Sequence, residues 1–331
     1  MTNTPLPAAV CVLGMGLIGG SLMRAVQPHV PVFGWAPGIR TRAAAVGDGF
    51  DVVDELDAAL ERATQADALV VMAAPITAFP QLLRRIDEFA PATRLTDVAS
   101  VKAPIAVEVA ALAPQARYIG SHPMAGTEHS GWAAGSAELF ADHVWVTTLR
   151  EDSDVDLWAP IAGLAVTIGS RVVPCEAVSH DDAVARISHL PHLMAAALAQ
   201  VGSMGGPLAL SLAASSFRDG TRVAATRPEL TRAMCETNAS YVIDAMDEAL
   251  AQLGVARGSL ASSGSLAKLA TVGFDARAEF DRRFDGLESV QLTGDDMAEQ
   301  LLSVGSGGGY VTGISSTATD FVIDAMYPPE D

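Results

Sequence analysis

The sequence predicts an α/β fold: a Rossmann-type, doubly wound parallel sheet followed by an all-helical domain. Three observations predict it. A glycine-rich turn joins a short apolar strand to a helix within the first 26 residues, strands and helices alternate as far as about residue 175, and only helical spacing follows. A chain of 331 residues, 50% hydrophobic and 18% charged, is long enough for two domains and has the composition of a globular protein.

The first element is the apolar strand Val10–Leu13, followed by the turn Gly14-Met-Gly-Leu-Ile-Gly19 and a helix. In this order the glycines are typical of a dinucleotide-binding turn. Gly14 permits the tight turn, Gly16 lets the backbone approach a pyrophosphate, and Gly19 allows close helix–strand packing. The helix start at Leu17, Ile18 and Gly19 offers backbone N–H groups to the phosphates. The alternative is a tight turn with a purely structural role.

Further strands and helices alternate after this turn. Strands are expected at residues 30–34, 67–72, 94–97, 117–120, 144–148 and 171–173, with amphipathic helices between them, for example at 78–89, 104–112 and 154–168. Such alternation implies a parallel sheet with helices on both faces. Ala74 and Pro75, which follow the strand at 67–72, are assigned to the cofactor site together with the glycine turn.

The pattern changes after Pro174. Helical spacing continues over 177–203, 207–215, 228–253 and 255–270, which predicts a first domain at 1–175 and a helical dimerisation and substrate domain at 176–290. The apolar segment 192–215 contains Pro207 and many small residues, so a buried helical pair is expected there rather than a membrane span. Residues 291–331 are left open between a tail and a strap across a partner subunit.

Composition excludes several classes of function. The net charge of −18 argues against nucleic acid and anionic membrane surfaces as partners. The chain starts without the basic segment of a signal peptide, and its three cysteines lie far apart without metal spacing. We therefore expect a cytoplasmic protein with reduced cysteines and no metal site.

The end of the second strand is informative about the cofactor. A carboxylate there would bind the ribose 2′-hydroxyl of NAD+, but Trp35 and Ala36 occupy the expected position. Arg40 and Arg42 follow, and either could meet a 2′-phosphate, although exposed arginines are usually only solvated. The missing acid favours NADP+ or dual use over strict NAD+.

Two residues are candidates for the chemistry. His122 follows the strand at 117–120, on the loop where a parallel sheet places its ligands, and its side chain titrates near neutral pH. An imidazole there suits taking a proton while a hydride leaves. Ser100 lies between a strand and a helix, where it could cap the helix or orient a substrate hydroxyl or His122.

The helical domain offers further polar candidates. It opens with Ser188-His-Leu-Pro-His192, and we reject zinc because no cysteine or aspartate stands at metal spacing. Arg222 could clamp a carboxylate through two parallel hydrogen bonds, or it could form a salt bridge with Asp219 or Glu229.

Taken together, these segments resemble the prephenate/arogenate dehydrogenase family of tyrosine biosynthesis. Five motifs occur in the family's order: the glycine turn with Gly19-Gly-Ser21, Asp97-Val-Ala-Ser-Val-Lys102, Ser121-His-Pro-Met-Ala-Gly-Thr-Glu128, Ser188-His-Leu-Pro-His192 and Phe217-Arg-Asp-Gly-Thr-Arg222. The resemblance implies a Rossmann-type domain and a helical domain that forms an intertwined homodimer. It also implies oxidation of prephenate to 4-hydroxyphenylpyruvate, or of arogenate to tyrosine, with NAD(P)+ and loss of CO2.

The resemblance assigns roles to individual residues. His122 matches the histidine that accepts the proton of the substrate 4-hydroxyl, and Ser100 matches a serine that bonds that hydroxyl or positions the histidine. Arg222 matches the arginine that binds the ring carboxylate. The remaining matches are substrate-binding positions, which are Ser188, His192, Thr127 and Glu128. No acidic residue stands at the end of the second strand, which argues against strict use of NAD+. Whether tyrosine inhibits the enzyme by feedback is left open.

Two rival functions share part of this pattern. Another two-domain NAD(P)-dependent dehydrogenase, of the β-hydroxyacid or imine-reducing type, would call for a catalytic lysine or a different substrate loop early in the helical domain, where this chain has His189 and His192 and no lysine. A non-catalytic NADPH-sensing module would need the glycine turn but not His122, Ser100 and Arg222 together.

Overall fold

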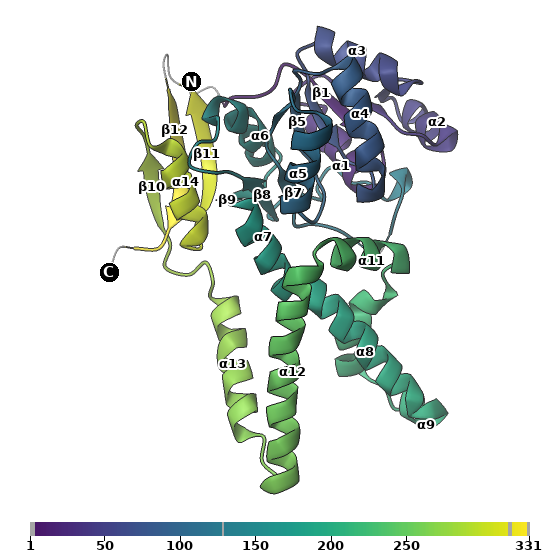
Figure 1. The fold of residues 1–331 in the computed structure, drawn as a ribbon, viewed down its shortest axis with the longest axis vertical. Helices are drawn as coiled ribbons and strands as arrows, with labels where there is room; N and C mark the ends of the chain where they lie inside the picture. Colours follow the sequence, from purple (N-terminus) through teal and green to yellow (C-terminus); the bar gives the residue numbers. More distant parts are fainter. Residues whose placement is uncertain (1–3, 128, 317–319, 330–331) are drawn as a thin grey trace. The chain divides into compact units, whose positions relative to one another are not determined.

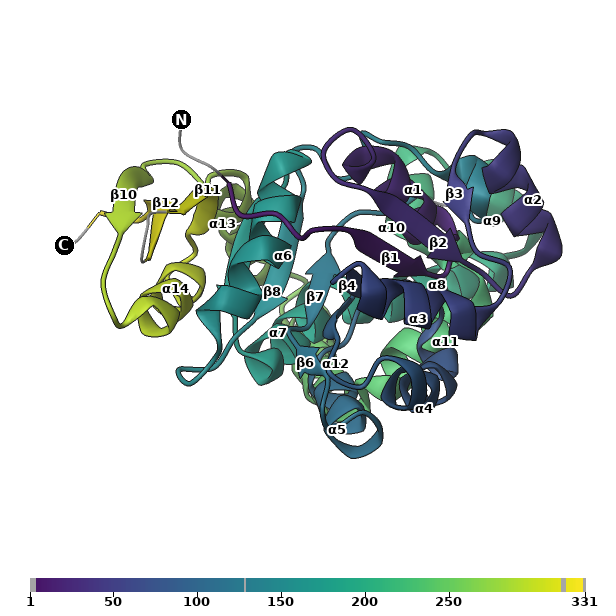
Figure 2. The same ribbon diagram turned by 90° about the horizontal axis from the view of Figure 1, so that it is seen from above.

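The computed structural model describes residues 4–127, 129–316 and 320–329. The chain divides into two compact units, one made of the described parts of 1–180 and 287–331 and the other of residues 181–286. The division falls inside helix α7 (Ala177–Val184), five residues beyond the boundary that the sequence predicted near 175. Figures 1 and 2 show the elements of both units from two directions.

The first unit contains the predicted parallel sheet. Its order is β3-β2-β1-β4-β5-β6, and every neighbouring pair is parallel. The strands are β1 (Val10–Leu13), β2 (Val32–Trp35), β3 (Asp51–Val52), β4 (Leu69–Met72), β5 (Arg94–Asp97) and β6 (Arg117–Tyr118). The order reverses between β1 and β4, which is where such sheets bind their ligands.

Helices cover both faces of this sheet because its central strands are apolar on both sides. In β1, Val10 and Val12 belong to one buried cluster, whereas Cys11 and Leu13 belong to another. The helices of this part are α1 (Leu17–Val26), α2 (Ile39–Gly47), α3 (Leu56–Gln65), α4 (Phe79–Phe89) and α5 (Ala103–Leu112). Burial raises the pKa of the Cys11 thiol to about 12, so this cysteine is a protonated core residue.

A second sheet lies in the same unit, and it corrects part of the prediction. Its order is β10-β12-β11-β9-β8-β7, and only β8 and β9 pair in parallel. The strands predicted at 144–148 and 171–173 are β8 (Val144–Thr148) and β9 (Arg171–Cys175), so they do not extend the first sheet. Helix α6 (Val155–Thr167) connects them and buries eight residues.

The described part of residues 291–331 is not a tail, because it belongs to the second sheet. Strands β10 (Glu288–Leu292), β11 (Tyr310–Ser316) and β12 (Phe321–Tyr327) belong to the second sheet, and β11 pairs with β9. Helix α14 (Met297–Ser306) buries Leu301 and Val304 in the same cluster as α6. Their alternating apolar side chains complete a core that α6 begins, which is why these residues fold with the first unit.

The second unit is helical, as predicted, but its helices break at different positions. A π-helical turn (Ala185–His189) is followed by α8 (Leu190–Met204), α9 (Gly206–Ser211), α10 (Ser215–Thr221), α11 (Pro228–Thr237), α12 (Ala239–Ser262) and α13 (Ala267–Asp281). The helix expected at 228–253 is interrupted at Asn238. The amide of that residue donates to the carbonyl oxygen of Asp181 at 2.7 Å and contacts Nδ1 of His189 at 3.1 Å.

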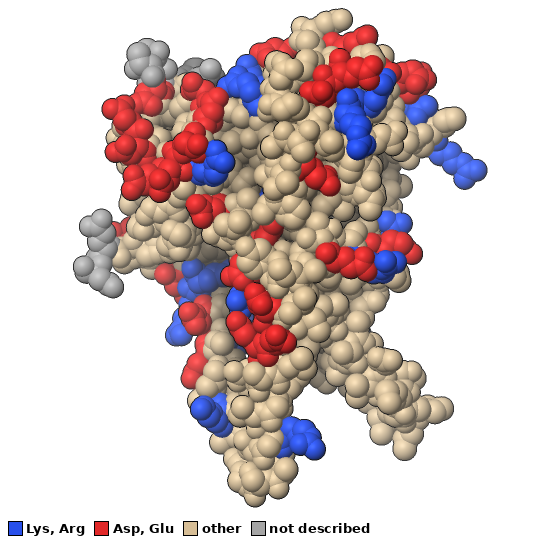
Figure 3. Space-filling model, viewed as in Figure 1, with Lys and Arg blue, Asp and Glu red and all other residues tan. Residues whose placement is uncertain are grey.

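The surface agrees with the composition. Acidic side chains predominate on much of the face in Figure 3, whereas the end of the helical unit that carries α9 shows no charged side chain there. Within the described part of the chain, no helix has the length and hydropathy that crossing a membrane requires.

Candidate active site

The glycine turn has the geometry that a dinucleotide needs. Gly14 has φ of +111°, and a Cβ built on it would lie 2.6 Å from the carbonyl of Ala73. A Cβ on Gly19 would lie 1.9 Å from the carbonyl oxygen of Gly14, so the helix approaches the turn too closely for any side chain. By contrast, no atom lies within 4 Å of a Cβ built on Gly16. The turn is therefore closed where it packs and open at the predicted pyrophosphate position.

The start of α1 fits an anionic ligand. Gly16 is its N-cap and supplies no side-chain hydrogen bond, and Leu17 and Ile18 are only half-buried. The first turn of a helix has backbone N–H groups without intrahelical partners, which suit the oxygens of a pyrophosphate. The backbone nitrogen of Ala74 lies 2.7 Å from the built Cβ of Gly14, so Ala74 stands beside the turn.

The end of β2 carries no acidic side chain. Ala36 is 4% exposed, and its carbonyl oxygen accepts a 2.7 Å hydrogen bond from Arg42. Arg42 also contacts Asp54 at 3.4 Å, so its guanidinium is held by the protein itself. Arg40 is exposed in the first turn of α2. Of the two arginines, Arg40 is the more exposed.

His122 lies on a strand rather than on a loop, which corrects the prediction. Strand β6 ends at Tyr118, and the chain passes at Gly120 into β7 (Ser121–Pro123), where His122 pairs with Val146 of β8 in antiparallel register. A Cβ on Gly120 would lie 2.7 Å from Oγ1 of Thr148, so only glycine fits this passage between the two sheets.

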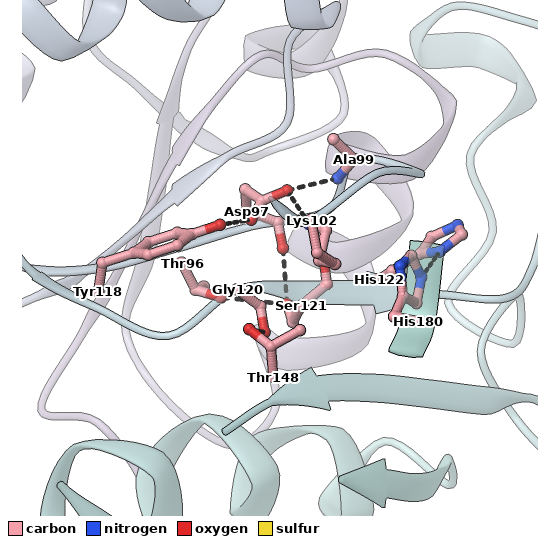
Figure 4. Close-up of polar contacts among 10 residues, drawn as sticks. All are labelled: Thr96, Asp97, Ala99, Lys102, Tyr118, Gly120, Ser121, His122, Thr148 and His180. Atoms are coloured by element: carbon pink, nitrogen blue, oxygen red, sulfur yellow. Dashed lines mark hydrogen bonds and ion pairs between the residues drawn. The ribbon is translucent and has the colours of Figure 1, made fainter. Parts of the chain in front are cut away.

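A buried polar network holds this passage (Figure 4). Asp97, at the end of β5, forms an ion pair with Lys102, and both side chains are fully buried. Lys102 also donates to the backbone carbonyl of Ser121 at 2.7 Å, and the hydroxyl of Ser121 donates to the carbonyl of Asp97 at 2.6 Å. The residue before His122 is thus bonded through both its backbone and its side chain.

The carboxylate of Asp97 is fully engaged. One oxygen accepts from Lys102 and from the backbone N–H of Ala99 at 2.7 Å, while the other accepts from the Tyr118 hydroxyl at 2.6 Å. A buried ion pair withstands its desolvation only when such further bonds are present. Removing one partner typically costs about 3–5 kcal/mol, because it leaves an uncompensated buried charge.

His122 also has a side-chain partner that sequence reasoning missed. Its Nδ1 lies 2.9 Å from Nε2 of His180, and the two rings meet edge to face with centroids 5.1 Å apart. His180 is 3% exposed and lies on α7, whereas His122 is half-buried. The only sequence signal was a histidine in the first helix after the strand at 171–173.

Ser100, Thr127 and Glu128 are the other site residues that the sequence predicted in this part of the chain. Ser100 is half-buried, and α5 begins at Ala103 with Lys102 as its N-cap, so Ser100 does not cap that helix. Thr127 is exposed, and its hydroxyl accepts from the backbone N–H of His129 at 3.2 Å. Glu128 lies outside the described residues.

The helical unit holds the other predicted substrate residues. His192 is half-buried, and its Nδ1 lies 2.9 Å from the carbonyl oxygen of Ser188. His189 is fully buried, so the two histidines of this motif do not share one environment. Arg222 is exposed at the start of a 3-10 turn (Arg222–Ala225) that packs against α8.

The structure bears on the alternative that the sequence left open for Arg222. Within the described residues Arg222 forms no ion pair with Asp219 or Glu229, and Asp219 lies 3.6 Å from Arg218 instead. No group of three or more histidine, cysteine, aspartate or glutamate side chains that could hold a metal ion occurs among the residues that the structure describes.

Comparison with known proteins points to one family. Residues 20–174 match the family model described as the nucleotide-binding domain of prephenate dehydrogenase, and residues 176–269 match the model of its dimerisation domain. The first match begins after the glycine turn, so the assignment of that turn rests on its geometry.

Individual relatives agree with these matches. A cyclohexadienyl dehydrogenase of Zymomonas mobilis is 32% identical over 269 residues, which cover 76% of this chain and 88% of that protein. A Corynebacterium glutamicum structure described as a candidate prephenate dehydrogenase is 44% identical with a TM-score of 0.81, covering 84% of this chain and 90% of that one. The arogenate dehydrogenase of Synechocystis is 28% identical with a TM-score of 0.70, covering 83% and 99%.

Two glycine substitutions should separate packing from cofactor binding. In Gly19→Ala the new methyl group meets the Gly14 carbonyl, and we expect a loss of about 1–3 kcal/mol in the free energy of unfolding. In Gly16→Ala the methyl group has room, so stability should hold while dinucleotide affinity falls about ten- to a hundredfold, the value of a lost charge-assisted hydrogen bond. Denaturant unfolding and titration calorimetry measure both. Unchanged affinity in Gly16→Ala would remove the turn from the cofactor site.

Proposed function

Because the chain belongs to the prephenate dehydrogenase family, we propose that it oxidises prephenate or arogenate with NAD(P)+ and releases the ring carboxylate as CO2. One observation carries this proposal. A single compact unit contains both an open, uncapped glycine turn and a half-buried histidine whose position is fixed by a fully bonded network. The first feature suits a dinucleotide, and the second suits an acid–base residue.

In the proposed reaction His122 acts as the general base. Its Nε2 accepts the proton of the substrate 4-hydroxyl while the hydride leaves C4 of the ring. The C–C bond to the ring carboxylate then breaks, its electron pair enters the ring, and CO2 and an aromatic product form. When it is bound, the nicotinamide supplies the hydride acceptor. A neutral imidazole relieves the positive charge that hydride loss would otherwise leave on the substrate.

The other candidates bind and orient the substrate. We assign Ser100 to the 4-hydroxyl or to the ring of His122, and Arg222 to the ring carboxylate, which a guanidinium can hold through two parallel hydrogen bonds. We assign Ser188 and His192 to binding the side chain of the substrate, which is pyruvyl in prephenate and alanyl in arogenate. Thr127 and Glu128 are proposed for the mouth of the site.

The cofactor is proposed to be a nicotinamide dinucleotide, with NADP+ used at least as well as NAD+. The end of β2 offers no carboxylate to the ribose, since Ala36 stands there. Arg40 is exposed beside it, whereas Arg42 is bound by Ala36 and Asp54. A 2′-phosphate therefore meets no carboxylate on Trp35 or Ala36 themselves, and the exposed guanidinium of Arg40 can attract it.

The proposed partner is a second copy of the same chain. The only core cluster described in the helical unit contains three buried residues, Ala185, Val242 and Ala245. Helix α13 has no buried residue, and Val272, Phe274 and Phe280 on it are between 53% and 74% exposed. Residues 187–217 contain no Lys, Arg, Asp or Glu, and α8 and α9 expose Met204 and Leu208. A single chain leaves these faces in water, which a symmetric dimer would cover.

The function is tested with both substrates, each with NAD+ and NADP+, by the absorbance of the reduced nicotinamide. We expect wild-type turnover in at least one combination and a loss of about 10²–10⁴-fold in kcat for His122→Asn, because the general base is removed. Cofactor affinity, measured by calorimetry, should stay unchanged. His143→Asn, on an exposed histidine of the same unit, serves as the control. Near-normal kcat in His122→Asn would exclude the proposed role.

The cofactor proposal is tested at position 36. In Ala36→Asp a carboxylate can bind the 2′-hydroxyl and repel a 2′-phosphate, so kcat/KM should shift towards NAD+ by about ten- to a hundredfold. In Arg40→Gln, kcat/KM for NADP+ should fall while that for NAD+ holds. A wild-type preference for NAD+ of about a hundredfold or more would mean that another residue binds the ribose.

The dimer is tested by light scattering at micromolar concentration, where we expect twice the mass of one chain. Leu208→Glu and Phe274→Glu place charges on the exposed apolar helices and should shift the equilibrium towards monomers. Val107→Glu, on an apolar residue exposed on the first unit, is the matched control and should leave the mass unchanged. A wild-type monomer under these conditions would contradict the proposal.

A further inference from the structure

The contact between His122 and His180 determines which nitrogen of His122 can act as a base. Nδ1 of His122 lies 2.9 Å from Nε2 of His180, so one of these two nitrogens carries the hydrogen between them. A neutral imidazole has one protonated and one unprotonated nitrogen. If Nδ1 of His122 donates to His180, its Nε2 is left unprotonated and able to take a proton from a substrate. If His180 donates instead, Nε2 of His122 carries a hydrogen and cannot act as a base.

We propose that His180 is a positioning residue that accepts a hydrogen bond from Nδ1 of His122 and so keeps Nε2 of His122 as the base. This inference rests on the proposed role of His122 as the general base that takes the proton of the substrate 4-hydroxyl. Second partners of this kind fix the tautomer and ring orientation of histidines in other sites, where a carboxylate or a carbonyl is the usual acceptor. Here the imidazole of His180, which is 3% exposed, takes that place.

The fold positions His180 independently of His122. His122 lies on β7, β8 lies next to it, and β9 on the far side of β8 leads directly into α7, which carries His180. Two strand spacings separate β7 from β9 by about 10 Å, a distance that two facing side chains can bridge. The backbone N–H of His180 donates to the carbonyl of Glu176 at 2.9 Å, so its helix turn is formed. Hydrogen-bonded strands therefore set the separation of the two rings.

The choice of an imidazole has a chemical consequence. The carboxylate of Asp97 accepts bonds from Lys102, Ala99 and Tyr118, so it does not serve as the partner of His122. A carboxylate partner would stabilise the imidazolium strongly and slow its deprotonation. A neutral imidazole can orient the base without adding a negative charge of its own.

Two substitutions separate hydrogen bonding from shape. The amide of His180→Gln can present an oxygen close to the position of Nε2, whereas His180→Phe keeps a ring but has no acceptor. We expect His180→Phe to lower kcat about ten- to a hundredfold, the usual effect of removing such a partner, with KM for substrate and cofactor affinity little changed. The Gln variant should recover most of this loss. His143→Phe, on a histidine that contacts the Ala141 carbonyl, controls for the substitution itself.

A measurement on the wild-type protein does not depend on the folding of any His180 variant. In protein with ¹⁵N-labelled histidine, the His122 signals, assigned by their loss in His122→Asn, should report a protonated Nδ1 and an unprotonated Nε2. The opposite tautomer would overturn the proposal, as would wild-type kcat in His180→Phe. Near-normal kcat in His122→Asn would instead overturn the proposed role of His122, and no turnover of either substrate by the wild type would overturn the proposed function, so the failures can be told apart.

Discussion

The buried ion pair between Asp97 and Lys102 is the interaction on which the candidate active site depends. It joins the end of the parallel sheet to the start of α5, and through the Ser121 carbonyl it also fixes the first residue of the second sheet. Both charges lie out of water, so the pair persists only because Ala99, Tyr118 and Ser121 satisfy the remaining bonds. One electrostatic contact thereby determines where the chain crosses between two sheets and where His122 emerges.

That crossing explains why the sequence predicted the parts of this site unevenly. The glycine turn was predictable because its requirements are local: Gly14 needs a positive φ, and Gly19 cannot carry a Cβ where α1 meets the turn. His122 could be found from its motif, yet its strand could not. A three-residue strand such as β7 has no periodicity of its own and exists because β8 pairs with it.

Contacts between distant segments could not be predicted from the sequence for the same reason. His180 is 58 residues from His122, and no spacing rule relates a strand to a helix that follows the next-but-one strand of a mixed sheet. The structure of residues 291–331 could not be predicted because it depends on the pairing of β11 with β9, which lies far away in the sequence. By contrast, the parallel arrangement of the first sheet could be predicted from the alternation of strands and helices. Its two-residue edge strand β3 was not among the expected strands, because so short a strand has no periodicity of its own.

The helical unit differs from the first unit in how its stability is supplied. Its only described core cluster has three buried residues, so within one chain apolar burial contributes little to holding α12 and α13 in place. The helix that carries His192, and the turn with Arg222 that packs against it, belong to this same unit. If a second copy covers these faces, as proposed, the buried area that orders the helices also orders the residues assigned to the substrate. Assembly and substrate binding would then share one source of free energy, whereas the cofactor turn is complete within a single chain.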